Sequence, residues 1–363
     1  MLVTGGTGFI GANFIRCWIA RHPDDRITNL DKLTYAGNLE NLSGIDSHPS
    51  YRFVHGDICD AALVASLFRN EEISTVVHFA AESHVDRSIL GPQEFIRTNV
   101  QGTFTLLEAA RSHWLSGLPP GNPSDRPPRE SFCFLHVSTD EVYGSLAPEE
   151  PPFKETTGYA PKSPYSASKA GSDHLVRAYY HTYRLPAIVT NCSNNYGPYQ
   201  FPEKLIPLAI CRAIEGESIP IYGDGTNVRD WIYVDDHCSA LEAVLERGKT
   251  GETYNIGGGN QWKNIDLVKM ICDLLDDRLG SVSVPRRSLI KLVQDRPGHD
   301  RRYAMDISKI AADLGWKPGA TLATGMARTI DWYLNHQDWV KRVMSGEYQA
   351  YWAAQYGSRW VTG

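Results

Sequence analysis

The chain has 363 residues, more than one ordinary domain, so one large domain or two are expected. Its 36 Lys and Arg residues against 42 Asp and Glu residues leave a net charge of −6, which gives no electrostatic reason to bind nucleic acid or an anionic membrane. The seven cysteines include no C-x-x-C pair and no apolar run approaches about 18 residues, so the sequence predicts a cytoplasmic protein without a disulfide framework, metal site, signal peptide or membrane span.

Short β-branched or aromatic runs alternate with helical patterns through residue 191. The runs are LVT, RITNLD, YRFVHGD, STVVHFA, SFCFLHVS and PAIVTN. This alternation predicts an α/β fold with a doubly wound parallel sheet. Shorter mixed elements follow, so we expect one domain at 1–191 with a return segment near 232–260, and a smaller mixed α/β domain at 192–231 and 261–363. The proline-rich run 117–130 predicts an exposed loop.

The run TGGTGFIG places Gly5, Gly8 and Gly11 between a strand and the helix FIGANFIRCWIARH. With this spacing, backbone N–H groups and the helix N-terminus face a diphosphate, as in dinucleotide-binding folds. Asp31 ends the next strand, about 20 positions beyond Gly11, where a carboxylate accepts hydrogen bonds from ribose hydroxyls and repels a 2′-phosphate. The pattern therefore predicts that the first domain is of the Rossmann type and binds NAD in preference to NADP.

The run GDI, which contains Asp57 and Ile58, follows the third predicted strand. Asp57 is in position to contact the adenine edge of a bound dinucleotide. It is equally in position to form a turn or to cap the N-terminus of the helix AALVASLF. The sequence leaves both interpretations of Asp57 open.

Two adjacent carboxylates, Asp140 and Glu141, come just after the apolar run FCFLHV, in the stretch HVSTDEVYG. One interpretation is structural, because Ser138 and Glu141 have the S-x-x-E spacing of a helix capping box. The other is catalytic, with one carboxyl group as acid and its neighbour as base. Since consecutive strand residues point to opposite faces, both acids can reach one ligand only if the strand has ended before them.

Tyr165 and Lys169 in SPYSASKAGSDHLVRAYY have i,i+4 spacing, which places a phenol and an ammonium group on one helix face. A free phenol has a pKa of about 10, so a tyrosine base at neutral pH needs a nearby cation that favours the phenolate. Helices also carry Tyr and Lys at this spacing by chance. The pair therefore indicates a reaction only alongside the dinucleotide motif.

Together these motifs resemble the extended short-chain dehydrogenase/reductase family, in its nucleotide-sugar branch. TGGTGFIG, STDEVYG and Y-x-x-x-K carry the resemblance, and further matching runs extend it over nearly the whole chain: NLDKLTYAGN, FAAESHVDRSI, NCSNNYGPYQFPEKLIP, PIYGDGTNVRDWIYVDDH and DRPGHDRRYAMD. The triplet Thr139-Asp140-Glu141 discriminates within the branch, because 4-epimerases lack the acid pair, whereas GDP-mannose dehydratases and UDP-glucuronate decarboxylases tend to keep only the Glu. The resemblance therefore implies dehydration of dTDP-glucose to dTDP-4-keto-6-deoxyglucose.

The resemblance also implies a role for each catalytic residue. Tyr165 would take the proton of the C4 hydroxyl, assisted by Lys169 and Thr139, while a hydride passes to NAD. Glu141 would take the C5 proton and Asp140 would protonate the departing C6 oxygen, after which the hydride returns to C6. An ionised Glu141 next to Asp140 would raise the pKa of Asp140 and so keep that acid protonated.

The remaining site residues are implied by the same resemblance. For the cofactor they are Gly5, Gly8, Phe9, Ile10, Gly11, Asp31, Lys32, Thr34, Asp57, Ile58, Phe79, Ala80, Ala81, Ser83, Thr98, Tyr165, Lys169 and Asn195. For the nucleotide sugar they are Ser83, Thr139, Asn194, Lys204, Leu205, Pro220, Ile221, Tyr222, Arg229, Asn264, Arg296 and His299. Arg229 would grip the diphosphate, although a salt bridge to Asp230 or another acid is an alternative for its side chain.

A homodimer is implied by the resemblance alone, through helices around 95–114 and 164–183. Two alternative functions stay open at this point. One is another NAD-dependent nucleotide-sugar enzyme, a 4-epimerase or a UDP-glucuronate decarboxylase. The other is a non-catalytic dinucleotide-binding protein, which would be expected to lack the Tyr/Lys pair or one of the acids, whereas this chain has both.

Overall fold

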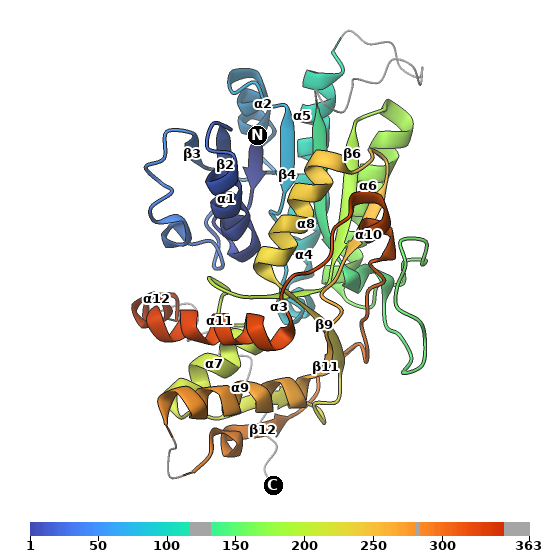
Figure 1. The fold of residues 1–363 in the computed structure, drawn as a ribbon. Coiled ribbons are helices and arrows are strands. Elements are labelled where there is room, and N and C mark those ends of the chain that lie inside the picture. The colour runs from blue at the N-terminus through green and yellow to red at the C-terminus, as the bar shows by residue number, and fades with distance from the viewer. Residues whose placement is uncertain (117–131, 281–283, 345–363) are drawn as a thin grey trace.

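The computed structural model describes residues 1–116, 132–280 and 284–344, so the predicted loop at 117–130 lies outside the described residues. Parallel strands form a central sheet in the order β10-β6-β5-β4-β1-β2-β3 (Figure 1). They are β1 (Leu2–Thr4), β2 (Ile27–Asp31), β3 (Tyr51–His55), β4 (Thr75–His78), β5 (Cys133–Thr139), β6 (Ala187–Cys192) and β10 (Thr253–Ile256). The strand runs predicted from the sequence are β1 to β6, so the predicted parallel sheet is confirmed.

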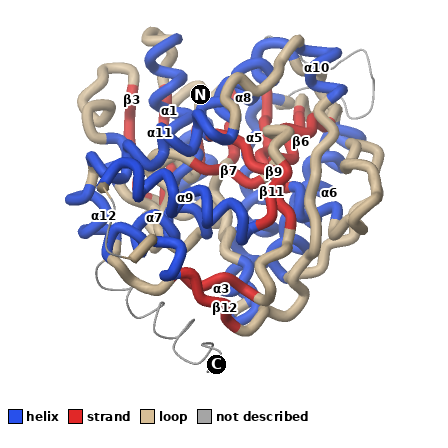
Figure 2. Tube along the Cα trace, turned by 60° about the horizontal axis from the view of Figure 1, so that its bottom comes forward, coloured by secondary structure: helices blue, strands red, loops and turns tan. Residues whose placement is uncertain are grey.

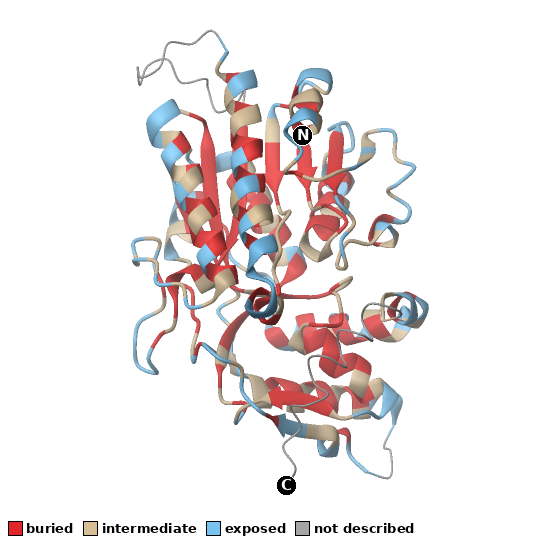
Figure 3. Ribbon diagram, turned by 180° about the vertical axis from the view of Figure 1, so that it is seen from behind, coloured by how far each residue is buried: buried red, intermediate tan, exposed pale blue. Residues whose placement is uncertain are grey.

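Helices cover both faces of this sheet, because successive strand side chains point to opposite sides. On one face Val3 and Leu135 pack in a core with helices α1 (Phe9–Arg21), α8 (Val234–Arg247) and α10 (Ser308–Leu314). On the other face Leu2 and Phe134 pack with α2 (Ala61–Asn70), α5 (Thr103–Trp114) and α6 (Pro164–Tyr183). Figure 3 views the molecule from this second side and shows buried residues concentrated where the helices meet the strands. The predicted doubly wound arrangement is therefore confirmed.

Local sequence signals fix where two of these helices begin. Asp60 caps α2 by accepting hydrogen bonds from the backbone N–H groups of Ala62 and Leu63, both at 3.0 Å. The alternative that Asp57 caps this helix is therefore wrong, because the cap lies three residues later. At α6 the hydroxyl of Ser163 accepts a hydrogen bond from the N–H of Ser166 at 3.0 Å, and Pro164 suits the first helical position.

A smaller part of the molecule lies below the parallel sheet in Figure 1 and comes forward in Figure 2. It contains a three-stranded sheet of β11 (Gln261–Lys263), β9 (Val228–Tyr233) and β7 (Asn194–Tyr196), and a pair of parallel strands, β12 (Ile290–Val293) and β8 (Ile219–Tyr222). Its helices are α7 (Leu205–Glu215), α9 (Asn264–Leu279), α11 (Leu322–Asn335) and α12 (Gln337–Val343). Their buried faces share one apolar core with β8 and β9.

The chain crosses between the two parts several times. After α9 and β12 it returns to the parallel sheet, where Ile310 and Leu314 of α10 pack in the core beside α8. The boundary expected from the sequence, with all of 261–363 in the smaller domain, does not include this return. The other short helices of the described residues are α3 (Val85–Leu90), α4 (Pro92–Phe95), η1 (Leu39–Leu42), η2 (Ile96–Gly102), η4 (Asp140–Tyr143) and η5 (Arg286–Leu289).

Candidate active site

A cavity of about 430 Å³ lies between the carboxyl ends of the parallel strands and the smaller part. Doubly wound sheets bind their ligands at this edge. Most of the predicted site residues line the cavity: Gly5, Gly8, Phe9, Ile10, Gly11, Asp31, Lys32, Thr34, Asp57, Ile58, Phe79, Ala80, Ala81, Ser83, Thr98, Thr139, Asp140, Glu141, Tyr165, Lys169, Asn194, Asn195, Lys204, Leu205, Tyr222, Arg229, Asn264, Arg296 and His299. The fold thus brings together residues from the first strand to the loop after β12.

Two of the predicted residues, Pro220 and Ile221, do not line the cavity. Both are buried on β8, and the side chain of Ile221 packs in the core of the smaller part. Tyr222, the last residue of that strand, reaches the cavity. Of the three residues expected to wall the nucleotide base, only Tyr222 lines the cavity, because Pro220 and Ile221 are buried away from it. The contact of Tyr222 with a base stays a prediction.

The glycine loop at the start of α1 is shaped for the close approach of a ligand. Gly5 has a φ of +71°, and a Cβ there would lie 2.7 Å from backbone atoms of Ala80. A Cβ at Gly11 would collide with the carbonyl oxygen of Gly5. Gly8 precedes α1 and provides no side-chain cap, so the first N–H groups of the helix are available to an anion. These features fit the diphosphate of a dinucleotide.

Asp31 lies where the ribose of that dinucleotide is expected. Its two carboxylate oxygens accept hydrogen bonds from the backbone N–H groups of Thr7 at 3.0 Å and Leu33 at 2.9 Å. These bonds fix the carboxylate at the cavity wall. Each carboxylate oxygen can accept more than one hydrogen bond, so Asp31 still fits a ribose diol.

Asp57 is part of a turn and of a small charge cluster. Its carboxylate accepts a hydrogen bond from the backbone N–H of Cys59 at 2.9 Å, which confirms the turn interpretation. It also pairs with Lys32 at 3.0 Å and Arg97 at 2.8 Å. Burial opposes the charge of Asp57, but these partners hold its pKa below the usual value. The contact of Asp57 with adenine stays a prediction.

The two adjacent acids lie on a turn directly after β5. Thr139 ends the strand, and its hydroxyl accepts a hydrogen bond from the N–H of Glu141 at 3.3 Å. The hydroxyl of Ser138 donates instead to Asp173 at 2.9 Å, so the capping box of Ser138 and Glu141 is wrong. Because the strand has already ended, Asp140 and Glu141 both line the same cavity.

Burial and neighbouring charges act differently on these acids. Asp140 is buried, and its Oδ2 atom has no hydrogen-bond partner in the part of the chain that the structure describes. Burial, followed by the charges of Glu141 and Asp230, raises the pKa of Asp140 well above its usual value. Burial also raises the pKa of Glu141, but the positive charges of Arg296 and Lys204 oppose that rise. The pair therefore suits one protonated acid beside one carboxylate base.

Tyr165 and Lys169 lie one turn apart on α6, and both line the cavity. The Nζ of Lys169 donates to the carbonyl oxygen of Val137 at 2.9 Å, and burial lowers the pKa of this lysine. Burial, then the charge of Glu141, raises the pKa of Tyr165 well above its usual value, and a hydrogen bond with Thr139 opposes this. That Lys169 favours the phenolate of Tyr165 stays a prediction, and burial and the Glu141 carboxylate oppose it.

The smaller part supplies cations to the opposite wall. The guanidinium group of Arg229 donates to the carbonyl oxygens of Val228 and Asp300, both at 2.8 Å, and lies over the ring of Tyr303. Its partners among the described residues are thus carbonyl groups, and the alternative of a salt bridge to Asp230 is not observed. Arg229 is buried at the cavity wall with its charge uncancelled by a carboxylate in direct contact.

Two buried polar atoms of the described residues on this wall could form hydrogen bonds with a ligand. The Nε of Arg296 and the Oδ1 of Asn264 are buried and have no hydrogen-bond partner within 1–116, 132–280 and 284–344. An unpaired buried polar atom costs about 1–3 kcal/mol. A ligand with an anionic group and a donor would remove that cost. Nearby, Lys204 donates to the carbonyl oxygen of Ser83 at 3.0 Å.

Several residues that line the cavity were not predicted from the sequence: Glu82, His84, Val85, Asp86, Cys192, Gln200, Phe201, Glu203, Trp231 and Tyr303. Glu203 accepts a hydrogen bond from Tyr35 at 3.1 Å, which joins the loop after β2 to the smaller part. The hydroxyl of Tyr303 donates to Asp300 at 2.6 Å. The sequence signal that could have identified Glu203 and Tyr303 is their position in the runs FPEKLIP and DRRYAMD, close to residues that were predicted.

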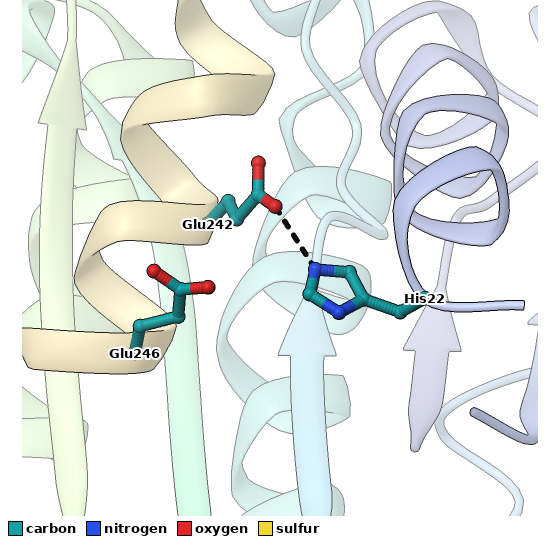
Figure 4. A group of neighbouring side chains, drawn as sticks. All are labelled: His22, Glu242 and Glu246. Carbon is teal, nitrogen blue, oxygen red and sulfur yellow. Dashed lines mark hydrogen bonds and ion pairs between the residues drawn. The ribbon is translucent and has the colours of Figure 1, made fainter. Parts of the chain in front are cut away.

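One group of possible metal ligands occurs in the described ranges, and it lies outside the cavity. His22 at the end of α1 faces Glu242 and Glu246 of α8 (Figure 4), with their ligand atoms within 4.8 Å of one another. Arg21 also pairs with Glu242, so a cation already neutralises that carboxylate. Among the described residues, no helix is long and apolar enough to cross a membrane.

This chain is similar to known proteins over nearly its whole length. The family described as GDP-mannose 4,6 dehydratase matches residues 2–329. A dTDP-glucose 4,6-dehydratase from Xanthomonas campestris pv. campestris (strain B100) is 56% identical over 349 residues, covering 96% of this chain and 97% of that protein.

Two solved structures are similar in fold. The dTDP-glucose 4,6-dehydratase DesIV from Streptomyces venezuelae, with NAD bound, has a TM-score of 0.84 and 46% identity, covering 94% of this chain and 99% of that one. The dTDP-glucose 4,6-dehydratase from Bacillus anthracis str. Ames, in complex with NAD, has a TM-score of 0.82 and 44% identity, covering 94% and 98%.

Proposed function

The chain belongs to the GDP-mannose 4,6 dehydratase family and, within it, to the dTDP-glucose 4,6-dehydratases, and from this premise we propose that it converts dTDP-glucose to dTDP-4-keto-6-deoxyglucose. The observation that carries the proposal is the convergence of Asp140, Glu141 and Tyr165 on one cavity. Loss of water across C5 and C6 needs a base for the C5 proton and an acid for the C6 oxygen. It also needs a ketone at C4, which makes the C5 hydrogen acidic.

The cofactor is NAD. The glycine loop holds its diphosphate and Asp31 holds its adenosine ribose, which disfavours NADP. Lys169 and Asn195 are positioned for its nicotinamide riboside, because both line the cavity close to the end of β5. Bound there, NAD supplies a hydride acceptor for C4 and a hydride donor for C6, together with a positive charge in its oxidised ring.

Tyr165 acts on the C4 hydroxyl. Its own surroundings hold the phenol protonated, so the tyrosine becomes a base only when further positive charge lies nearby. Lys169 contributes to that charge, and the hydroxyl of Thr139 is placed to relay a hydrogen bond between the sugar and the phenol. The proton of the C4 hydroxyl thus moves to the Tyr165 oxygen as the ketone forms.

Glu141 and Asp140 then perform the elimination. Glu141 takes the proton from C5, and the cations of the smaller part keep it ionised enough to do so. Asp140, whose pKa is raised by burial and by Glu141, stays protonated at neutral pH and donates to the departing C6 oxygen. The two adjacent groups therefore fill opposite roles because they differ in burial and in charged neighbours.

The smaller part holds the nucleotide. Arg229 and Arg296 bind the diphosphate, since each presents guanidinium donors on the cavity wall. Asn264 and His299 lie at the same wall, and Tyr222 flanks the base. Asn194 is placed to bind the sugar. Thymine differs from uracil by one methyl group, worth about 1–3 kcal/mol, so the preference for dTDP rests on the relatives.

The proposal extends to assembly and compartment. Leu90, Ile96, Phe104 and Tyr183 are exposed apolar side chains on α3, η2, α5 and α6, which supports a homodimer through these helices. The cysteine pattern, which includes no C-x-x-C pair, supports a reducing cytoplasm. Light scattering should give the mass of a dimer, and Phe104→Glu should shift it toward a monomer. A monomeric mass for the unchanged chain would contradict the dimer.

The sharpest test follows the hydrogen atoms of the sugar. With deuterium at C4 of dTDP-glucose, mass spectrometry should find the label at C6 of a 6-deoxy product, because a closed site prevents exchange with water. In heavy water, unlabelled substrate should gain deuterium at C5. A 4-epimerase would return the label to C4 without a 6-deoxy product, and a binding protein would leave the substrate unchanged. Either result would reject the proposed function.

A further inference from the structure

A fully buried carboxylate lies behind the catalytic helix face. Tyr165, Lys169 and Asp173 follow one another at i, i+4 and i+8 on α6, so all three point the same way. Tyr165 and Lys169 line the cavity, whereas Asp173 is 0% exposed beneath it. No step of the proposed reaction uses Asp173. Burying a charged carboxylate costs free energy, so the burial of Asp173 needs an explanation other than a step of the reaction.

Asp173 is held by hydrogen bonds from two other elements. The hydroxyl of Ser138 on β5 donates to its Oδ2 at 2.9 Å, and the hydroxyl of Tyr159 donates to the same atom at 2.8 Å. Arg177, one turn further along α6, donates to the Tyr159 hydroxyl at 2.9 Å. This network fixes the position of Asp173. Burial raises the pKa of Asp173, but His136, the charge of Lys169 and the hydrogen bond from Ser138 outweigh burial and lower it, which favours the charged form.

The groups facing Asp173 leave its charge available to Lys169. His136 of β5 has its Nε2 at 3.2 Å from Oδ1 of Asp173, but burial lowers the pKa of His136 to about 4, so this ring is neutral at pH 7. His78 of β4, beside His136, is also buried, and burial lowers its pKa well below the usual value. Cys192 of β6 is a thiol whose pKa is raised to about 12. None of these three carries charge at pH 7.

Lys169 needs an anion of this kind. Its side chain is buried, and a buried lysine tends to lose its proton, with pKa values of about 5–6 known for such sites. The negative charge of Asp173 is the largest influence that opposes this loss, while the carbonyl oxygen of Val137 accepts from Nζ at 2.9 Å. A neutral Lys169 would no longer favour the Tyr165 phenolate.

We propose that Asp173 is a positioning residue that keeps Lys169 in its charged form, so that the tyrosine base can work. This inference rests on the proposed function for its kinetic consequence. The charge of Lys169 itself can be measured without any turnover. Failure of the inference and failure of the function are therefore separable.

The kinetic test is the pH profile of C4 oxidation in a single turnover, followed by absorbance of the reduced nicotinamide. Asp173→Asn keeps the size of the side chain but removes the charge. Lys169 is charged below its pKa, so a lower pKa moves the alkaline limb of the profile to lower pH. We expect a shift of about one pH unit, which is a tenfold loss of rate above that limb.

Tyr159→Phe is the matched control. It removes one hydrogen bond to Asp173 but leaves the carboxylate ionised, so the alkaline limb should stay in place even if the rate falls. An unshifted limb in Asp173→Asn, or an equal shift in Tyr159→Phe, overturns the proposal. If dTDP-glucose gives no 6-deoxy product with the unchanged chain, the proposed function fails, and the next measurement still decides the inference.

The independent readout is ¹³C NMR of the unchanged chain labelled with [ε-¹³C]lysine, with Lys169→Met used to assign the Lys169 resonance. Despite its burial, Lys169 should carry its charge at neutral pH, because Asp173 compensates for the loss of water. A neutral Lys169 at pH 7 overturns the proposal. This measurement also holds if Asp173→Asn does not fold.

Discussion

The two walls of the cavity carry different sets of charged groups. The sheet side, at the ends of β2 and β5, presents the carboxyl groups of Asp31, Asp140 and Glu141, whereas the smaller part presents Arg229 and Arg296. Neither wall alone carries both the adjacent acids and the two arginines. Arg296 and Arg229, which we propose bind the diphosphate, also oppose the rise in the pKa of Glu141. In this proposal the residues that bind the substrate also favour the ionised form of the base.

Removing the base on the sheet side should have the largest effect. Glu141→Gln cannot take the C5 proton, so formation of the 6-deoxy product should fall about 10³-fold, with accumulation of a 4-keto hexose that keeps its C6 hydroxyl. Mass spectrometry of the quenched reaction distinguishes the two sugars. Binding of dTDP should change little, because the nucleotide lies at the other wall. Normal product formation would remove Glu141 from the role of base.

The acid on the same wall should affect a later step than the tyrosine. Asp140→Asn should lower the overall rate about 10²-fold yet still allow C4 oxidation, so reduced nicotinamide should build up in a single turnover. Tyr165→Phe should prevent that build-up while substrate still binds. If Asp140→Asn also abolishes the absorbance change with substrate bound, the acid acts earlier than proposed.

Removing a cation from the opposite wall tests whether the walls are coupled. Arg296 lowers the pKa of Glu141, so Arg296→Gln should raise it and move the acidic limb of kcat about one pH unit higher. The sign follows because the base must be ionised, and a higher pKa means that it is protonated up to a higher pH. Measurement at saturating substrate separates this shift from weaker binding. Arg301→Gln, at an exposed arginine paired with Asp224, should leave the limb unchanged.

The smallest expected effect concerns the cofactor end of the sheet side. Because Asp31 repels a 2′-phosphate, NAD should bind about tenfold more tightly than NADP, and Asp31→Asn should narrow that ratio. Titration calorimetry measures both constants. Because the proposed reaction regenerates NAD in each cycle, the cofactor should also copurify. Equal binding of NADP to the unchanged chain would refute the role of Asp31.

Much of the parallel sheet could be predicted because its signals are local. Strand runs, the glycine spacing and Asp31 each lie within a short window, and β1 to β6 formed where those runs indicated. Pairings between distant strands have no such local signal. For example, β8 pairs with β12, although β9, α8, β10, β11, α9 and η5 lie between them in the chain. The order of the smaller sheets could not be read from periodicity.

The site was predicted less completely, for the same reason. The residue types and spacing of Tyr165 and Lys169 were visible, but the burial that raises the pKa of Tyr165 depends on elements far away in the sequence. Asp230, which helps to raise the pKa of Asp140, was considered only as a partner for Arg229. Such environments arise from packing, so they follow from the folded chain and not from any single motif.

The position of the edge strand β10 in the chain affects how the protein folds while it is made on the ribosome. It pairs with β6 in parallel, from Thr253 to Ile256, yet β7, α7, β8, β9 and α8 separate the two strands in the chain. As the chain emerges from the ribosome, β6 therefore stays an open sheet edge until these intervening elements and β10 itself have been made. Nascent chains stalled before residue 253 should bind chaperones that recognise exposed strands, and those released after β10 should not.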